Sequence, residues 1–348
     1  MKQRIKEFDM IRAIVPFGII IYHFQCHSKS PFKLLPDYAN GKWGAPFVVI
    51  FLVLSGASLY YNYPKIESLK EYYKKRFLAI MPCFYLVWFY FYIEKVLLTK
   101  DFFFAGPPWK MLLTLIGMDG YLNSTIQGYY FIGEWFLGAL VMMYLIYPLL
   151  LKAYTKKPAL TAAVVLLIFA LAMGIKGAKD FGLGVKLPFC VYGFPGIPSC
   201  LFSFFMGMVL VSKLKDKDSF IIDNKILLPV SAVIIILALF FKVPVYYAFT
   251  WDLLGTAFFI VIYHIGKIIF LFLDRDGKLA ELLRKPAAIS YPIFLVQHQI
   301  ITKLLAAYDP DTFAGTCLMI LAAILLSVVA GTVLQFGIKA FILGKKEE

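Results

Sequence analysis

The chain contains about ten apolar stretches, each close to the ~20 residues that a helix needs to cross a bilayer. By residue number they are 10–27, 44–62, 77–97, 131–151, 159–175, 199–212, 227–242, 249–273, 287–307 and 313–342. The 348 residues are 61% hydrophobic and only 16% charged, which is too few charges to cover a water-soluble surface of this size. The sequence therefore predicts an all-α polytopic membrane protein, a bundle of about ten transmembrane helices.

The first apolar stretch follows a basic start and therefore has the outline of a cleavable signal peptide. A cleavage site needs small residues at the end of such a stretch, but Tyr22, His23 and Phe24 stand there. We therefore expect the stretch to remain as the first helix of the bundle.

The net charge of +14 is distributed unevenly between the two sides of the predicted bundle. Counted over alternate loops, the side that holds both termini carries about twice as many Lys and Arg residues as the other side. The positive-inside rule then places both termini in the cytoplasm of a multi-pass protein of the cell membrane. Because topology accounts for the basic residues, we expect the lipid bilayer, and no nucleic acid, as a partner.

No low-complexity or soluble stretch separates the apolar segments, so we expect residues 1–348 to form one membrane domain without an appended soluble domain. The long loop 98–130 carries apolar side chains that suit the membrane interface, and we expect it to cover one mouth of the bundle as a lid. Cys190 and Cys200 are interpreted as buried apolar residues, although their positions also permit a disulfide.

Ionisable groups inside a bilayer are costly, so each one needs a partner or a function. The residues of this kind within or beside the apolar stretches are Arg12, His23, Glu134, Asp252, His264 and His298. The spacing of Arg12 and His23 places them roughly 20° apart around a helix and ~16 Å apart along it. They therefore line one face, with Arg12 near the cytoplasm and His23 deep in the membrane.

The chemistry of this pair indicates a site for a phosphate-bearing ligand. A fixed guanidinium at the mouth suits a phosphate group, and an imidazole further in suits proton transfer. An interhelical hydrogen bond is the structural alternative for His23. His23 and His27 are one helical turn apart, but no H-E-x-x-H pattern accompanies them, so we expect no metal site.

Six segments resemble, in order along the chain, the motifs of the acyltransferase-3 family. The first extends from Phe8 to Phe24 and contains the Arg and the His, separated by ten residues, that mark this family. The others extend from Phe51 to Gly56, Lys74 to Pro82, Trp135 to Pro148, Phe204 to Gly207 and Ser290 to His298. The last is matched to the family pattern S-Y-x-x-Y-L-x-H.

The resemblance implies a multi-helix membrane enzyme that acylates, most often acetylates, sugars of cell-surface polysaccharides or glycolipids. Ala79 stands where many members of the family place a second Arg before the proline, and Leu140 and Cys200 stand where the larger branch often places Glu and Arg. The chain therefore resembles the short, single-domain branch, and roles tied to those three positions are not transferred to it.

Acetyl-CoA, or another acyl-CoA, is the donor that the resemblance implies. Arg12, Lys75 and Arg76 lie on the predicted cytoplasmic side and would bind its phosphates, although Lys75 and Arg76 also suit a positive-inside anchor. His23 would act as general base on the acceptor hydroxyl, and Ser55 would donate to the acyl carbonyl or steady the imidazole. Direct transfer and a histidine acyl-enzyme are both open at this point.

The remaining ionisable residues have a functional and a structural interpretation each. Glu134 and Asp252 fall near extracytoplasmic helix starts, where they would bind hydroxyls of a glycan or glycolipid acceptor or would suit the helix dipole. His298 would orient a ligand, relay protons or pack between helices, and His264 is expected to form a hydrogen bond in the core. The main alternative function is a carrier or flippase for a lipid-linked sugar or another solute, and a third is a non-catalytic scaffold.

Overall fold

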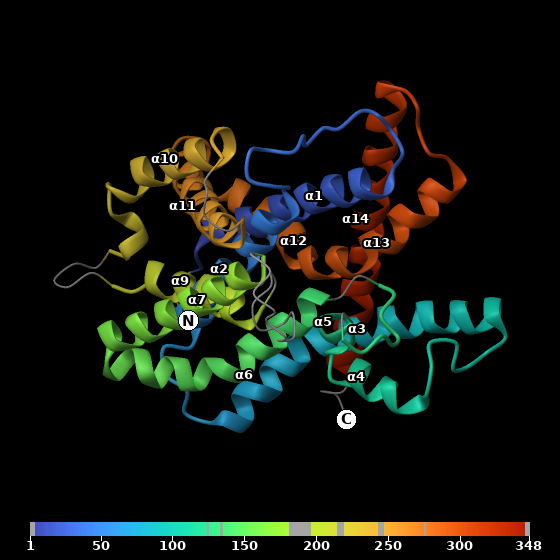
Figure 1. The fold of residues 1–348 in the computed structure, drawn as a ribbon, viewed down its shortest axis with the longest axis horizontal. Helices are drawn as coiled ribbons and strands as arrows, with labels where there is room; N and C mark the ends of the chain where they lie inside the picture. The colour runs from blue at the N-terminus through green and yellow to red at the C-terminus, as the bar shows by residue number, and fades with distance from the viewer. Residues whose placement is uncertain are drawn as a thin grey trace. The chain divides into compact units, whose positions relative to one another are not determined.

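A computed structural model describes residues 4–123, 125–132, 135–180, 196–213, 219–242, 247–274 and 276–344, and this part of the chain is mainly helical (Figure 1). Its α-helices are α1 (Lys6–His27), α2 (Gly44–Asn62), α3 (Leu69–Thr99), α4 (Met111–Leu115), α5 (Asp119–Leu122), α6 (Trp135–Lys156), α7 (Pro158–Asp180), α9 (Ile197–Leu210), α10 (Leu227–Phe240), α11 (Tyr247–Leu273), α12 (Lys278–Ala288), α13 (Ser290–Ala307) and α14 (Phe313–Gly344). Within the described residues, β-structure is limited to two isolated bridges. The prediction of an all-α protein is confirmed.

The predicted apolar stretches all coincide with helices, and α2 has the predicted bounds. Among the described helices, α2, α3, α6, α7, α11 and α14 contain segments long and apolar enough to cross a membrane, and α9 and α10 are shorter apolar helices. Helix α3 begins at Leu69, earlier than predicted, because the polar residues from Lys70 to Arg76 are good helix formers and continue the helix. The helices support an integral, polytopic membrane protein.

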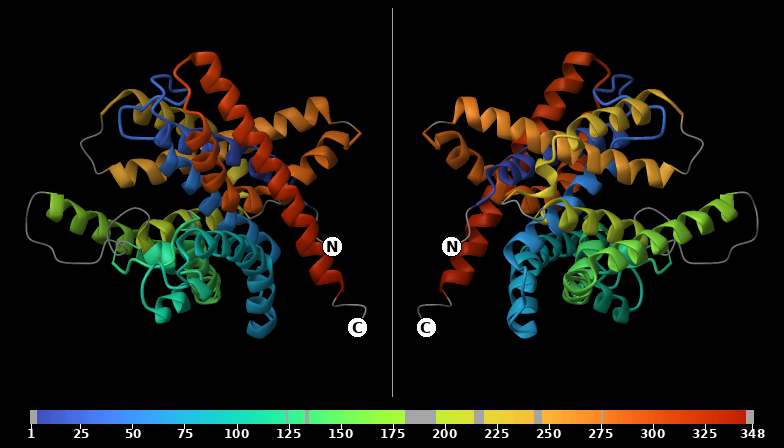
Figure 2. Two further views of the ribbon diagram at one scale, coloured as in Figure 1. Left: turned by 90° about the vertical axis from the view of Figure 1, so that its right-hand side faces the viewer. Right: turned by 90° about the vertical axis from the view of Figure 1, so that its left-hand side faces the viewer.

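Helix α14 illustrates how the apolar surface is arranged (Figure 2 shows it in red along most of its length). A row of exposed apolar side chains follows one side of this helix: Leu318, Leu325, Val329, Val333 and Phe336. Ile320 and Ala323 point the other way and are buried. An exposed apolar row of this length would be unstable in water and suits contact with lipid tails.

The chain divides into two compact units. The first consists of Met1–Ile11, Asp37–Tyr73 and Ala139–Arg275, and the second of Arg12–Pro36, Lys74–Gly138 and Asp276–Glu348. Each unit has its own packed helices, which are described separately below.

In the first unit, α2 packs against α9 and α11 through glycines. A methyl group on Gly56 would lie 1.8 Å from the carbonyl oxygen of Phe204, and one on Gly207 would lie 1.9 Å from the carbonyl oxygen of Val53. A methyl group on Gly255 of α11 would lie 2.5 Å from the side chain of Val49. Small residues therefore let these helices approach backbone to backbone, as is common in membrane bundles.

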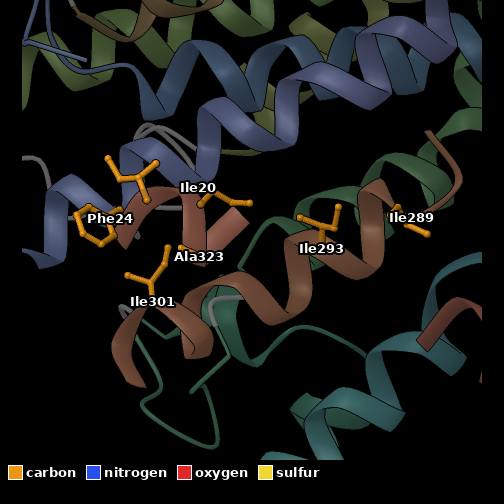
Figure 3. Packing of buried hydrophobic residues seen from close by; sticks show 7 residues of the cluster. Ile20, Phe24, Ile289, Ile293, Ile301 and Ala323 are labelled. Atoms are coloured by element: carbon orange, nitrogen blue, oxygen red, sulfur yellow. The ribbon is translucent and has the colours of Figure 1, made fainter. Parts of the chain in front are cut away.

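The second unit contains a buried apolar cluster that joins α1, α13 and α14 (Figure 3). Its members are Ile20, Phe24, Ile289, Ile293, Ile301, Ile320 and Ala323. Ile20 and Phe24 are one turn apart on α1, and Ile293 and Ile301 are two turns apart on α13. This spacing buries one face of each helix against the other.

The loop after α1 is tied back onto the second unit by polar contacts. The side-chain amide of Gln25 pairs with the backbone of Leu35, donating to its carbonyl at 2.9 Å and accepting from its N–H at 2.7 Å. Asp309, in the loop before α14, accepts from the Ser28 hydroxyl at 2.6 Å and from the Lys29 backbone N–H at 2.9 Å. These bonds fix the chain where it leaves His27.

Loop 98–130 is folded rather than extended, and it includes α4 and α5. Its buried centre is Asp119, which accepts from the Thr114 hydroxyl and from the Gly120 N–H, both at 2.8 Å. Trp109, Leu112, Leu115 and Ile116 are exposed on its surface. The apolar surface expected for this loop is present, and its role as a lid stays a prediction.

Candidate active site

Arg12 and His23 lie on one continuous helix, as predicted, and both are half-buried. Pro16 stands between them, and because proline has no N–H, the carbonyl of Arg12 lacks the usual helical donor one turn later. Helix α1 begins at Lys6, so Asp9 lies in its first turn, and the buried Asp9 carboxylate accepts from Arg4 at 3.0 Å.

The imidazole of His23 is held by a residue that the sequence analysis did not single out. Its Nδ1 lies 2.8 Å from Nε2 of Gln297, on α13. Gln297 is only 1% exposed, and its other amide atom, Oε1, has no hydrogen-bond partner among the described residues. One ring nitrogen of His23 is therefore engaged, which leaves Nε2 as the atom for chemistry.

Residues of the apolar cluster of the second unit lie on either side of the His23–Gln297 hydrogen bond along both helices. Gln297 is one turn from both Ile293 and Ile301, so the three side chains share one face of α13. On α1, His23 lies between Ile20 and Phe24 in the sequence. The buried apolar contacts on either side therefore set the register in which the two helices present His23 and Gln297 to each other.

His298, the next residue of α13, meets two histidines of α1. Its ring lies edge-on to that of His23, with the centroids 4.9 Å apart at an angle of 61°. Its Nε2 lies 3.2 Å from Nε2 of His27, which is exposed at the end of α1. The three imidazoles thus form a row from the exposed His27 through His298 to His23. The predicted site residues His23 and His298 are brought together.

Two further contacts fix α13 next to this row. Gln299 donates to the backbone carbonyl of Phe131. Lys303 pairs with Glu94 of α3, with 2.5 Å between Nζ and Oε1. Successive polar residues of α13 therefore reach different neighbours.

No group of three or more His, Cys, Asp or Glu side chains within the described residues is arranged to hold a metal ion. The His27–His298 contact is a hydrogen bond between two ring nitrogens, one of which must carry the hydrogen. A hydrogen bond between two imidazoles suits the row to acid–base chemistry.

The predicted phosphate ligands Lys75 and Arg76 lie near the start of α3, in the second unit. Lys75 is exposed and Arg76 is half-buried. Both follow Lys74, so this end of the helix carries a run of positive charge. Their role toward a phosphate-bearing ligand stays a prediction.

Ser55 and Asp252 belong to the first unit and are described there. Ser55 is half-buried on α2, beside the close contact at Gly56. Asp252 of α11 is 0% exposed, and its two carboxylate oxygens accept from the hydroxyls of Ser199 (2.7 Å) and Ser203 on α9. This carboxylate is fully buried and has a serine partner on each oxygen, so an acceptor sugar would reach it only after neighbouring side chains moved.

Two other predicted residues have simpler outcomes. His264 has its Nε2 2.9 Å from the carbonyl oxygen of Ile222, which confirms the expected hydrogen bond in the core. Glu134 lies outside the described residues, as does Cys190.

Gln297 is the residue of this site that sequence reasoning missed, and His27 was considered there only as a metal ligand. The signal that could have found Gln297 is the polar run Gln297-His298-Gln299 inside an apolar helix. Counted from Ser290, the final position of S-Y-x-x-Y-L-x-H falls on Gln297, so His298 lies one residue beyond the motif. The resemblance therefore carries no role onto His298, and its place in the site rests on the geometry.

A family model described as an acyltransferase domain, of the acyltransferase-3 type, matches residues 5–332. No curated protein and no solved structure matches the chain. The matched range includes Arg12, the histidine row and the helices that carry them. With six described helices long and apolar enough to cross a membrane, the chain belongs to the acyltransferase-3 family and is a membrane acyltransferase.

Proposed function

We propose that the protein is a cell-membrane O-acyltransferase that moves an acyl group, acetyl first among the candidates, from acyl-CoA to a sugar hydroxyl. The acceptor would be a cell-surface or lipid-linked glycan of the cell envelope. The observation that carries the proposal is the partly buried hydrogen bond at His23, since it engages one ring nitrogen and leaves the other for proton transfer in a chain of this family.

In the proposed reaction, Nε2 of His23 removes the proton from the acceptor hydroxyl. The hydroxyl oxygen then attacks the thioester carbonyl carbon, the carbon–sulfur bond breaks, and the coenzyme A thiolate takes the proton from His23. The products are the sugar ester and free coenzyme A, with no net gain or loss of protons. This direct route needs one base only, and we prefer it to a histidine acyl-enzyme for that reason.

The other residues would bind the two substrates. Arg12, with Lys75 and Arg76 on α3, would hold the phosphates of coenzyme A, because guanidinium and ammonium groups pair strongly with phosphate. Glu134 and His298 would contact the acceptor. The roles expected for Ser55 at the acyl carbonyl and for Asp252 at the acceptor stay predictions.

The test compares wild type with Arg12→Ala and His23→Ala, purified in detergent with candidate glycans as acceptors. We expect Arg12→Ala to weaken acetyl-CoA binding about 10-fold or more, since it removes a charge-assisted contact. We expect His23→Ala to bind acetyl-CoA normally and to lose roughly 10²–10⁴-fold in turnover, the usual share of a general base.

Two matched variants control for the loss of a cation or an imidazole. Arg284→Ala removes an exposed arginine that pairs with Glu281 on α12, and His264→Ala removes the histidine bonded to Ile222. Both should keep acetyl-CoA affinity and turnover. If wild type has no affinity for any acyl-CoA, the assignment of acyl-CoA as the donor is wrong. If His23→Ala is as active as wild type, His23 is not the general base.

A further inference from the structure

The side-chain amide of Gln297 lies 2.8 Å from Nδ1 of His23, and the residue is 1% exposed. We propose that Gln297 is a positioning residue, which holds His23 with its proton on Nδ1 and thereby leaves Nε2 as the base. The inference rests on the proposed function, because it assigns the tautomer that a base at His23 needs.

The argument begins with the two faces of an amide. If the Gln297 oxygen faces His23, it accepts the Nδ1 hydrogen, and Nε2 presents a lone pair. If the amino group faces His23, it donates to Nδ1, the ring hydrogen lies on Nε2, and this atom cannot accept a proton. Only the first arrangement serves a general base.

The same arrangement also serves the next step. Once Nε2 has taken a proton, the imidazolium still donates its Nδ1 hydrogen to the amide oxygen, so nothing has to rotate during the reaction. A neutral carbonyl oxygen stabilises this cation without introducing a buried negative charge into the membrane. The amide acts on His23 in the way that the Asn of a Cys-His-Asn triad acts on its histidine.

The unpartnered oxygen supports this assignment. A buried carbonyl oxygen without a donor loses its hydration and gains nothing in return, and Oε1 of Gln297 has no partner among the described residues. Oxygen and nitrogen of an amide occupy interchangeable positions, so a half-turn gives the oxygen the Nδ1 hydrogen of His23.

The experiment compares wild type with Gln297→Leu, Gln297→Glu and a control, Gln299→Leu. Leucine keeps the volume and removes the bond, so kcat should fall about 100-fold, while KM for acetyl-CoA should change less than about threefold. Glutamate favours the imidazolium, so this variant should stay active and its acidic limb in kcat/KM should move to higher pH by about one unit. Gln299→Leu removes an amide of the same helix that bonds to Phe131 instead, and its kcat should stay within about threefold of wild type.

A measurement independent of turnover is the ¹⁵N spectrum of the histidines. The chain has only four of them, and His23→Ala identifies the signal of interest. Wild type should show His23 with hydrogen on Nδ1, and Gln297→Leu should show a mixture of tautomers. A wild-type signal with hydrogen on Nε2, or a Gln297→Leu variant with unchanged kcat and pH profile, overturns the proposal.

The proposed function and the positioning role of Gln297 would be contradicted by different results. If wild type does not turn over acyl-CoA but the tautomer of His23 still depends on Gln297, the proposed function fails and the positioning role stands. If Gln297→Leu does not fold, the pH limb of Gln297→Glu and the wild-type spectrum decide the question.

Discussion

His298 meets His27 through their Nε2 atoms, which lie 3.2 Å apart, while its ring also packs edge-on against His23. Two imidazole nitrogens at this distance share one hydrogen, so one ring donates and the other accepts. The tautomers of His27 and His298 are therefore linked. Because His27 is exposed, the row of three rings leads from the surface to the half-buried His23.

Replacing His298 by Phe keeps an aromatic ring in the row and removes both nitrogens. We expect turnover with acetyl-CoA to fall about 10- to 100-fold, less than for loss of the base itself, because His298 does not remove the proton from the acceptor hydroxyl. Acetyl-CoA affinity and melting temperature in detergent should stay close to wild type. Unchanged turnover would assign His298 to helix packing.

Asp252→Ala tests whether this carboxylate is structural or binds the acceptor. The change leaves the hydroxyls of Ser199 and Ser203 buried without their acceptor, so we expect a loss of about 2–4 kcal/mol in the free energy of unfolding. Thermal unfolding in detergent measures it, with the exposed Asp311→Ala as control. A stable Asp252→Ala protein with a raised KM for the glycan would instead establish the acceptor-binding role.

Gly207→Ala should destabilise the protein, because the added methyl group would meet the carbonyl oxygen of Val53 at 1.9 Å and force α9 away from α2. Overpacking of this kind costs about 1–3 kcal/mol. Gly174→Ala is the matched control, since nothing lies within 4 Å of its added methyl group. That variant should gain a little stability from the better helix propensity of alanine. Equal melting temperatures for the two variants would contradict the close contact.

Asp119 gives a dependence of stability on pH with a definite sign. Burial raises the pKa of its carboxyl above the usual 3.8, although bonds from Thr114 and Gly120 act against this. The folded state therefore holds the proton more tightly than the unfolded state, and the stabilisation is complete below pH 3.8 and is lost as the pH rises through the folded-state value.

Compared with Asp119→Asn, wild type should thus lose stability as the pH rises above 3.8 and through the raised pKa of the folded state. Denaturation at a series of pH values measures the difference. Asp276→Asn is the control, because a hydrogen bond with Lys278 lowers the pKa of Asp276, and any effect there has the opposite sign. If the difference in the free energy of unfolding between wild type and Asp119→Asn does not change with pH, Asp119 has the same pKa in the folded and unfolded states.

The helices could be predicted from the sequence because a bilayer imposes both their length and their composition. Residues 44–62 show this most clearly, since the apolar stretch and α2 have the same bounds. The start of α3 was predicted too late, because Lys70 to Arg76 continue the helix without being apolar. A search for long apolar stretches does not detect polar extensions of a helix such as this one.

The site was only partly predictable. His23 and His298 were singled out because a titratable group is costly inside an apolar segment. Gln297 carries no charge, so a search for ionisable residues in apolar segments does not identify it, although it makes the contact with His23. Its importance depends on the packing of α1 against α13, and no local pattern of one helix contains that information.

Gly56 and Gly207 close the gap between α2 and α9 from opposite sides, each against a carbonyl of the other helix. Neither position has room for a compensating change, because a smaller neighbour cannot replace a backbone atom. Related sequences that keep this helix pair should therefore retain glycine at both places, whichever acceptor they modify. The presence of these two glycines in the family's motifs would then reflect the short distance between the two helices. It would say little about which substrate an enzyme prefers.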